Sequence, residues 1–291
     1  MTKKRVLVCG ASGFIGKNIF DRLSERDDLE VIGTYLTDAY GRNGGRYKNL
    51  VKVDLTDKKQ VTEVTKEVDI VIQAAAATSG VSDTIKRPQI QMTDNAIMNP
   101  LIFESAHDNH VKHILFFGSV VVYPPNTDRP LKETDVNLNS GFSPKYFGVA
   151  WTKTYIEKLC EFYAGLGRTR YTVVRHANIY GPYDRFDLGR SHVLAALITK
   201  TLTARDGKLV LWGNGQERKD LIHVSDLVNF VELTMEKQKS SFEVFNAGSG
   251  ELISVRDLAQ KIIIISGQKL SICYDQTAPT IPSSILLDST K

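Results

Sequence analysis

The chain has 291 residues, of which 42% are hydrophobic and 24% are charged, values typical of globular proteins. This composition excludes a disordered chain and fibrous repeats, and the length allows one large domain or two modest ones. The net charge of +4, from 37 Lys+Arg and 33 Asp+Glu, is too small and too scattered to indicate nucleic-acid binding.

Short β-branched segments alternate with longer segments of helical period through the first 175 residues. We predict strands at 5–9, 30–34, 50–53, 69–73, 113–117 and 171–175, and helices at 15–25, 58–67, 94–109 and 147–166. Strands that read as continuous apolar runs are typical of a parallel sheet covered on both faces. Because crossovers between parallel strands are right-handed, the pattern predicts an α/β fold with a doubly wound parallel sheet, the Rossmann architecture.

The regular alternation weakens after about residue 180. We predict a helix at 191–205, short strands at 208–211 and 221–224, a helix capped by Ser225 and Asp226, and a last helix at 255–266 ended by Gly267. We therefore expect a dinucleotide-binding domain over residues 1–175 and a smaller C-terminal, substrate-binding lobe over 176–291. Some later segments, such as 219–230, are expected to return to the first domain.

A glycine-rich motif directly follows the first predicted strand and opens the first helix. Three glycines at this spacing permit a tight turn, a close approach of the backbone to a pyrophosphate, and close packing of helix on strand. The helix N-terminus would face the negative charge. The motif predicts a dinucleotide cradle, and a glycine-rich turn that binds no nucleotide is the alternative. The residues expected to contact the cofactor are Gly10, Ser12, Gly13, Phe14, Ile15 and Gly16.

The end of the second predicted strand bears on the choice between NAD and NADP. A carboxylate there is typical of NAD-binding domains, but residues 33–37 read Gly-Thr-Tyr-Leu-Thr, and the first carboxylate is Asp38. Arg42 and Arg46 follow, and an arginine can pair with the 2′-phosphate of NADP. The segment therefore favours NADP, with a solvated loop that carries two arginines as the alternative.

Several further motifs, in order, resemble those of the extended short-chain dehydrogenase/reductases that act on nucleotide sugars. The resemblance runs from about residue 4 to the end of the chain. Within the family, residues 191–193 and 210–215 look like those of GDP-fucose synthases. The motifs are GxxGxxG at 10–16, Asp-Leu at 54–55, Ala-Ala-Ala at 74–76, Gly-Ser at 118–119 with Tyr-Pro at 123–124, Arg-His-Ala-Asn-Ile-Tyr-Gly-Pro at 175–182, and two landmarks at 222–226 and 245–248.

The resemblance implies an NAD(P)-dependent enzyme that moves a hydride at C4 of a nucleotide-diphosphate sugar, with a GDP-sugar favoured. It also implies a homodimer through helices 94–109 and 147–166, although these helices could simply cover the sheet. The cofactor contacts that it implies, beyond the glycine motif and Arg42, are Asp54, Leu55, Ala74, Ala75, Ala76, Lys153 and His176. The substrate contacts are Val121, Asn178, His192, Lys200, Trp212, Arg218 and Lys219.

The family's catalytic YxxxK motif is only half present. Lys153 stands where the family has the lysine that binds the nicotinamide ribose, but the tyrosine position is Val149, which cannot carry a proton. Tyr146, seven residues before Lys153, returns to almost the same helix face about 10 Å along the axis, and a packing role is its alternative. Tyr123 is a second candidate at a position that is usually a pocket wall. Ser119 fits a donor to a substrate hydroxyl, or a strand-end serine satisfied by backbone.

Other departures narrow the reaction. Residues 120–122 are all valine, so the Asp-Glu pair of the family's dehydratases is absent. GDP-fucose synthases use a cysteine and a histidine for double epimerisation; here the cysteine position is Val121, while His192 matches the histidine. Double epimerisation is therefore doubtful, and His192 alone is either an acid or base or a pocket histidine.

The expected diphosphate clamps also depart from the family. Asn178, Lys200, Arg218 and Lys219 are candidates because a diphosphate binds charge-assisted donors, but each could be plain surface. The family usually has an arginine at Lys219, so Arg218 is considered for that role. The arginine usual before residues 287–288 is absent, with Ser283 and Ser284 in its place, and the chain ends at Lys291, as if a last helix were lacking.

Two functions remain open. The first is a nucleotide-sugar oxidoreductase or epimerase, and the second is a catalytically silent NAD(P)-binding protein with a regulatory or partner-binding role, which Val149 supports. We expect a soluble cytoplasmic protein, because the longest aliphatic run, residues 262–265, is too short to span a membrane. Three separated cysteines without metal-ligand spacing agree with a reduced compartment and predict no metal site.

Overall fold

A seven-stranded parallel sheet forms the centre of the molecule, as the computed structural model shows for residues 2–37, 49–78, 87–125, 129–139, 141–278, 280 and 284–291. The strand order is β11-β6-β5-β4-β1-β2-β3, and all neighbours are parallel. The predicted doubly wound α/β fold is confirmed. The strands are β1 (Lys4–Cys9), β2 (Leu29–Tyr35), β3 (Leu50–Lys52), β4 (Ile70–Gln73), β5 (His113–Phe117), β6 (Arg170–His176) and β11 (Phe242–Ala247).

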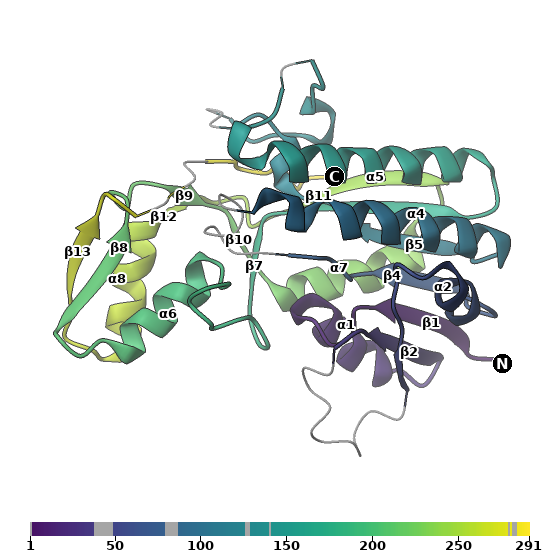
Figure 1. The fold of residues 1–291 in the computed structure, drawn as a ribbon, viewed down its shortest axis with the longest axis horizontal. Helices are drawn as coiled ribbons and strands as arrows, with labels where there is room; N and C mark the ends of the chain where they lie inside the picture. Colours follow the sequence, from purple (N-terminus) through teal and green to yellow (C-terminus); the bar gives the residue numbers. More distant parts are fainter. Residues whose placement is uncertain are drawn as a thin grey trace.

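Helices cover both faces of this sheet (Figure 1). Alternate residues of β1 point to opposite faces: Val6 and Val8 pack with α1, whereas Leu7 and Cys9 pack toward α4 and α5. This double burial explains why the strands read as continuous apolar runs. The helices on the first face are α1 (Phe14–Ser24) and α7 (Val224–Lys237), and those on the second are α2 (Lys58–Val64), α4 (Thr93–Asp108) and α5 (Phe147–Gly165).

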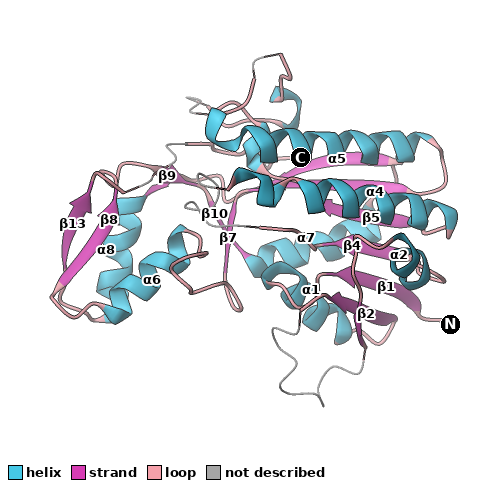
Figure 2. Cartoon of the chain, viewed as in Figure 1, coloured by secondary structure: helices cyan, strands magenta, loops and turns pink. Residues whose placement is uncertain are grey.

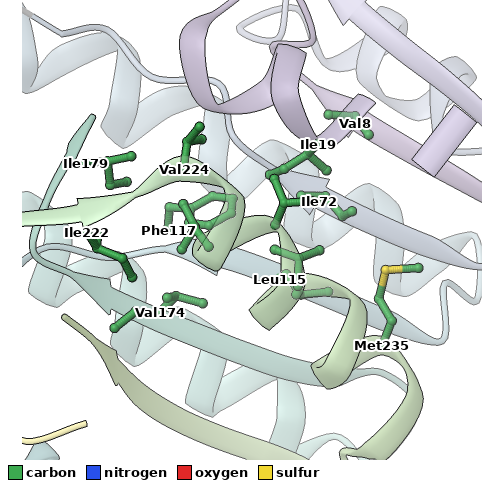
Figure 3. Packing of buried hydrophobic residues seen from close by; sticks show 14 of the residues in the cluster. Val8, Ile19, Ile72, Leu115, Phe117, Val174, Ile179, Ile222, Val224 and Met235 are labelled. Carbon is green, nitrogen blue, oxygen red and sulfur yellow. The ribbon is translucent and has the colours of Figure 1, made fainter. Parts of the chain in front are cut away.

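The core of the first face extends to the junction with the smaller lobe. Figure 3 shows Leu115 and Phe117 of β5 among residues of β1, β4 and α7. Ile179 and Ile222, from the short parallel strands β7 (Asn178–Tyr180) and β10 (Leu221–His223), lie in the same cluster. The chain segments that leave the sheet at its carboxyl edge are therefore fixed to its core.

The smaller lobe lies beside the central sheet (Figure 2). Its buried apolar side chains form a core of their own. Its strands β8 (Lys208–Trp212) and β13 (Ser271–Asp275) are parallel, and α6 (Val193–Thr203) packs on α8 (Val255–Ser266). The two-residue strands β9 (Arg218–Lys219) and β12 (Ile253–Ser254) are antiparallel. Among the described residues, no helix is long and apolar enough to cross a membrane.

The chain returns to the central sheet after residue 220. α7 packs on α1, where Arg22 and Arg26 bond the carboxylates of Glu232 and Glu236 at 3.2 and 2.9 Å, and β11 adds the seventh strand beside β6. Both elements therefore belong to the layers of the central sheet although they lie beyond residue 175.

The predicted cap of α7 is wrong by two residues. The N-cap is His223, whose Nδ1 accepts from the backbone N–H of Ser225 at 3.2 Å, while Ser225 and Asp226 lie inside the first turn. Statistics of capping favour serine and aspartate over histidine, so the sequence pointed to the wrong side chain. The end of α8 is as predicted, with Gly267 in the left-handed conformation at φ 69°.

Candidate active site

The glycine loop lies at the carboxyl ends of β1 and β4, where a doubly wound sheet reverses its order. Gly10 has φ +75°, and its N–H donates to Thr34 Oγ1 at 3.0 Å. A Cβ on Gly10 would lie 2.7 Å from the Cα of Ala75, and a Cβ on Gly16 would lie 2.2 Å from the Gly10 carbonyl oxygen. The loop therefore packs so closely on β4 and α1 that two of its positions require glycine.

The start of α1 has the features that a pyrophosphate requires. Its N-cap is Gly13, which has no side chain to accept from the first-turn N–H groups. These donors and the positive end of the helix are suited to an anion. Ser12, Phe14 and Ile15 are half-buried beside the loop. The residues present therefore fit the pyrophosphate of a dinucleotide.

The other predicted cofactor residues follow β3 and β4. Asp54 Oδ1 accepts from the N–H and the hydroxyl of Thr56 at 2.9 and 2.7 Å, so it stabilises the turn into α2, and Leu55 is buried. Ala74 and Ala75 are half-buried and Ala76 is exposed, directly after the end of β4. The NADP candidate Arg42, with Asp38 and Arg46, lies outside the described residues.

Lys153 places its amine at the end of β5. Its Nζ donates to the carbonyl oxygen of Phe117 at 2.7 Å and lies 4.7 Å from the ring centre of Phe116. Burial lowers the pKa of Lys153 to about 8, against an opposing effect of Glu157. The amine lies at the strand end where the nicotinamide ribose is predicted to bind, and its pKa falls near the physiological range.

Ser119 begins the segment after β5, two residues from Phe117. Its Oγ accepts from the N–H of Val121 at 3.3 Å and so caps the short 3₁₀ helix Val120–Val122. A hydroxyl that accepts one bond keeps its proton for another partner. Ser119 can therefore donate to a substrate oxygen while the backbone orients it.

Val149 is half-buried in α5, one turn before Lys153, and offers no proton. Tyr146 ends the short 3₁₀ helix Pro144–Tyr146 that leads into α5. Burial, with a smaller effect from the negative charge of Glu217, raises the pKa of Tyr146 to about 12. Tyr146 is therefore protonated at neutral pH, which suits a hydrogen-bond and proton donor and does not suit a base.

Two histidines lie within electrostatic reach of each other. His176 is the last residue of β6, and its Nδ1 is 2.8 Å from the carbonyl oxygen of Ala177. Burial lowers the pKa of His176 to about 4, and the charges of Lys153 and His192 act in the same direction. His192 is exposed at the N-cap of α6. His176 is therefore neutral at physiological pH, and both Lys153 and His192 are near enough to affect its pKa.

Tyr123 is excluded from contact with substrate by its burial. The ring is 1% exposed, and its hydroxyl donates to Asn246 Oδ1 at 2.6 Å. The same hydroxyl accepts from Arg175 Nη1 at 3.1 Å. The proton of Tyr123 is therefore committed to a buried network, and the second tyrosine candidate is wrong.

The predicted phosphate clamps fall into two groups. On the smaller lobe, Lys200 Nζ donates to the carbonyl oxygen of Val210 at 3.0 Å and lies 4.9 Å from the Trp212 ring centre. At the junction of the lobes, Asn178 Nδ2 donates to the carbonyl oxygen of Asp220 at 3.0 Å. The Lys200 amine and the Asn178 amide therefore both donate to backbone carbonyl oxygens, and these hydrogen bonds do not direct the two side chains toward one phosphate position.

Strand alternation separates Arg218 from Lys219. Lys219 is half-buried on the same side of β9 as Glu217, and its Nζ lies 3.5 Å from Glu217 Oε2, whereas Arg218 is exposed on the other side. Glu217 Oε1 is buried without a hydrogen-bond partner among the described residues. Glu217 was missed by sequence reasoning, because only the strand placement brings it near Tyr146.

Comparison with known proteins identifies the family of the chain. A model of the NAD dependent epimerase/dehydratase family matches residues 6–248. The chain is 28% identical to GDP-L-fucose synthase of Escherichia coli (strain K12), over 100% of this chain and 90% of that protein. It is 30% identical to GDP-L-fucose synthase of Sinorhizobium fredii, over 98% of this chain and 87% of that protein.

Solved structures share the fold over the same extent. UDP-glucose 4-epimerase from Thermotoga maritima has a TM-score of 0.84 at 24% identity, with 98% of this chain and 90% of that chain covered. A GDP-6-OMe-4-keto-L-xylo-heptose reductase from C. jejuni has a TM-score of 0.80 at 21% identity, with 100% and 91% covered. The resemblance inferred from the motifs is confirmed, and this chain belongs to the NAD dependent epimerase/dehydratase family, among relatives that are nucleotide-sugar epimerases and reductases.

Proposed function

We propose that this chain is a reductase of nucleotide-diphosphate keto sugars, which adds a hydride to C4 of the sugar. The observation that carries the proposal is the position of the Lys153 amine at the end of β5. There it donates to Phe117, which stands two residues before Ser119 in the chain. Relatives named GDP-L-fucose synthase, GDP-L-colitose synthase and dTDP-4-dehydro-6-deoxy-D-allose reductase support this class of substrate, with a GDP-sugar favoured.

The chain's own residues have distinct tasks in this proposal. A bound nicotinamide cofactor supplies the hydride. The glycine loop and the start of α1 bind the pyrophosphate, and Lys153 donates to ribose hydroxyls. Ser119 donates to the sugar carbonyl oxygen and so stabilises the negative charge that hydride addition leaves on that oxygen.

Tyr146 is proposed as the donor of the proton that completes the alcohol. Its raised pKa, about 12, keeps it protonated across the neutral range, so it can give a proton to an alkoxide but cannot take one from an alcohol. His192, exposed at the N-cap of α6, is the alternative donor. Val121 in place of a cysteine is a further reason to propose reduction without epimerisation.

Two finer properties accompany the proposal. NADP is proposed over NAD, because Thr34, Tyr35, Leu36 and Thr37 offer no carboxylate to the ribose after β2. A homodimer is proposed because α4 and α5 pack side by side and expose large apolar side chains. These are Ile97, Trp151, Tyr155 and Phe162, which are 43%, 39%, 48% and 60% exposed.

The test is a single-turnover measurement of reduced nicotinamide absorbance. Protein with stoichiometric NADPH or NADH is mixed with GDP-, UDP-, dTDP- and CDP-linked 4-keto sugars and with the corresponding alcohols. We expect absorbance to fall with one keto sugar, faster with NADPH, and to remain constant with the alcohols and NADP. Tyr146→Phe should slow the step by about 10²–10⁴-fold, while Tyr155→Phe, an exposed tyrosine of α5, should leave it unchanged.

The outcomes separate the alternatives. If a His192 variant slowed single-turnover reduction while Tyr146→Phe left its rate unchanged, the proton donor would be His192. Faster oxidation of an alcohol than reduction of any keto sugar would refute the reductase. A flat trace with every sugar, together with tight NADPH binding, would establish the silent cofactor-binding protein instead.

A further inference from the structure

Glu157, one turn after Lys153 in α5, forms a buried ion pair with Arg175. Arg175 Nη2 donates to Glu157 Oε2 at 2.8 Å, and Arg175 Nε lies 3.2 Å from both Glu157 oxygens. The two side chains are only 8% and 7% exposed. Glu157 follows Lys153 by four residues in α5, so both side chains lie on the same face of the helix.

Lys153 and Glu157 reach consecutive residues at the end of β5. The Lys153 amine donates to the carbonyl oxygen of Phe117. The next residue is Gly118, where a Cβ would lie 2.8 Å from Glu157 Oε1. Any larger residue at position 118 would therefore push the Glu157 carboxylate from its place beside Arg175.

Arg175 is itself held by neighbours from other segments. Its Nη1 donates to the hydroxyl of Tyr123 at 3.1 Å and to the carbonyl oxygen of Glu133 at 2.8 Å. Tyr123 in turn donates to Asn246 of β11. Because the guanidinium is fixed by these acceptors, the Glu157 carboxylate cannot follow the flexible lysine, and it defines a fixed negative charge beside it.

The other titratable groups around Lys153 are neutral at physiological pH. Burial raises the pKa of the Cys160 thiol well above its ordinary value, and burial lowers the pKa of His176 to about 4. The Tyr123 hydroxyl, next to Arg175, also has a raised pKa because it is buried. Within this cluster of described residues, the charge that acts on Lys153 is that of Glu157, and Arg175 is the ion-pair partner of that carboxylate.

We propose that Glu157 and Arg175 form a positioning pair, which fixes the Lys153 amine at the end of β5 and sets the pH range in which that amine is charged. Glu157 favours the charged amine, and Arg175 limits this effect by neutralising most of the carboxylate's charge. The consequence for hydride transfer rests on the proposed function. The effect on the amine itself is a property of the folded chain and is measurable without turnover.

A positioning pair and a purely structural ion pair lead to different expectations for the Lys153 amine. If Glu157→Gln removes the negative charge, the remaining guanidinium should make Lys153 lose its proton at a lower pH. If Arg175→Gln removes the positive charge, the unpaired carboxylate should hold the proton to a higher pH. Both variants should lower stability, but their effects on the amine have opposite signs.

The experiment is a pH titration of the full chain containing ¹³C-labelled lysine, followed by NMR at Cε and assigned with Lys153→Met. We expect the midpoint to move down by about one pH unit or more in Glu157→Gln and up by a similar amount in Arg175→Gln. The charge-conserving variants Glu157→Asp and Arg175→Lys control for packing and should move it much less. If Arg175→Gln does not fold, Glu157→Gln against Glu157→Asp carries the test.

The possible results give separate answers for the two proposals. Unchanged midpoints, or shifts of the same sign in both charge-removing variants, would overturn the positioning pair even if keto-sugar reduction were normal. Opposite shifts, in a wild-type chain that reduces no keto sugar, would support the pair and refute the reductase. If both proposals hold, the pH at which single-turnover reduction falls to half should shift with the NMR midpoint in each variant.

Discussion

Replacing Gly16 with alanine is expected to damage the glycine loop far more than the same change at Gly13. A methyl group at position 16 would lie 2.2 Å from the Gly10 carbonyl oxygen and 2.8 Å from its carbonyl carbon, so the obstacle is backbone and cannot rotate away. At position 13 the nearest atom, again Gly10 O, would be 3.3 Å away. A shift of a few tenths of an ångström relieves that contact.

The magnitudes follow from these distances. Overpacking against a rigid neighbour typically costs about 1–3 kcal/mol, so Gly16→Ala should lower the free energy of unfolding by about 2–3 kcal/mol, or the Tm by roughly 3–5 °C. The same shift moves the N–H groups of α1 that would face the pyrophosphate. Loss of a helix-terminus interaction worth up to about 2 kcal/mol would weaken cofactor binding by up to roughly 30-fold.

The measurements are urea unfolding and calorimetric titration with NADPH. Gly165→Ala is the matched control, because it lies at the end of α5 with nothing within 4 Å of its added Cβ, and should stabilise the chain by about 0.5–1 kcal/mol. Gly13→Ala should cost less than about 1 kcal/mol and weaken NADPH only slightly. Equal losses at positions 13 and 16, or normal NADPH affinity in Gly16→Ala, would refute the steric argument.

Three other changes test separate parts of the molecule. The free energy of unfolding should fall as the pH drops from 6.5 toward 4, because His176 is protonated in the unfolded chain in that range but stays neutral in the folded chain. In urea titrations His176→Asn should reduce this fall, and the same pH dependence in the variant and the wild type would contradict the burial of the imidazole. Phe162→Asp should convert a dimer into a monomer in sedimentation equilibrium, and a persistent dimer would place the interface elsewhere. Tyr123→Phe should cost about 1–3 kcal/mol of stability, since Asn246 and Arg175 lose a buried partner, with NADPH affinity unchanged; a large loss of NADPH affinity would restore Tyr123 to the site.

The sheet could be predicted from the sequence because its signals are local. Six of its seven strands are apolar runs flanked by helical patterns, and the predicted strand at 113–117 matches the observed bounds of β5. The seventh strand, β11, carries a family motif at 245–248 but is not predicted as a strand of this sheet. Its place beside β6 depends on a contact between segments far apart in the chain. Beyond residue 180, the predicted strands at 208–211 and 221–224 correspond to β8 and β10, whereas the two-residue strands β9 and β12 carry too few residues for a period to be read.

The site shows the same division. Ser119 and Lys153 follow from motifs in fixed order, and both lie at the end of β5. Glu217 gave no sequence signal, because its relation to Tyr146 spans 71 positions and depends on where the chain enters β9. Glu157 had a weak signal, a carboxylate four residues after Lys153, but its pairing with Arg175 depends on how α5 lies on β6.

The direction of the proposed reaction follows from which groups can hold a proton. Oxidation of an alcohol needs a base near neutrality, yet Val149 offers none, and a tyrosine with a pKa of about 12 is deprotonated in only about one molecule in 10⁵ at pH 7. Reduction needs the reverse, a group that is protonated before hydride arrives, and Tyr146 meets that requirement. At neutral pH the free protein therefore holds Tyr146 in the protonated form from which keto-sugar reduction begins. Val149→Tyr tests the assignment of Tyr146: a tyrosine one turn before the Lys153 ammonium should take over proton transfer, so that adding Tyr146→Phe no longer slows keto-sugar reduction. An undiminished effect of Tyr146→Phe in the Val149→Tyr chain would refute it.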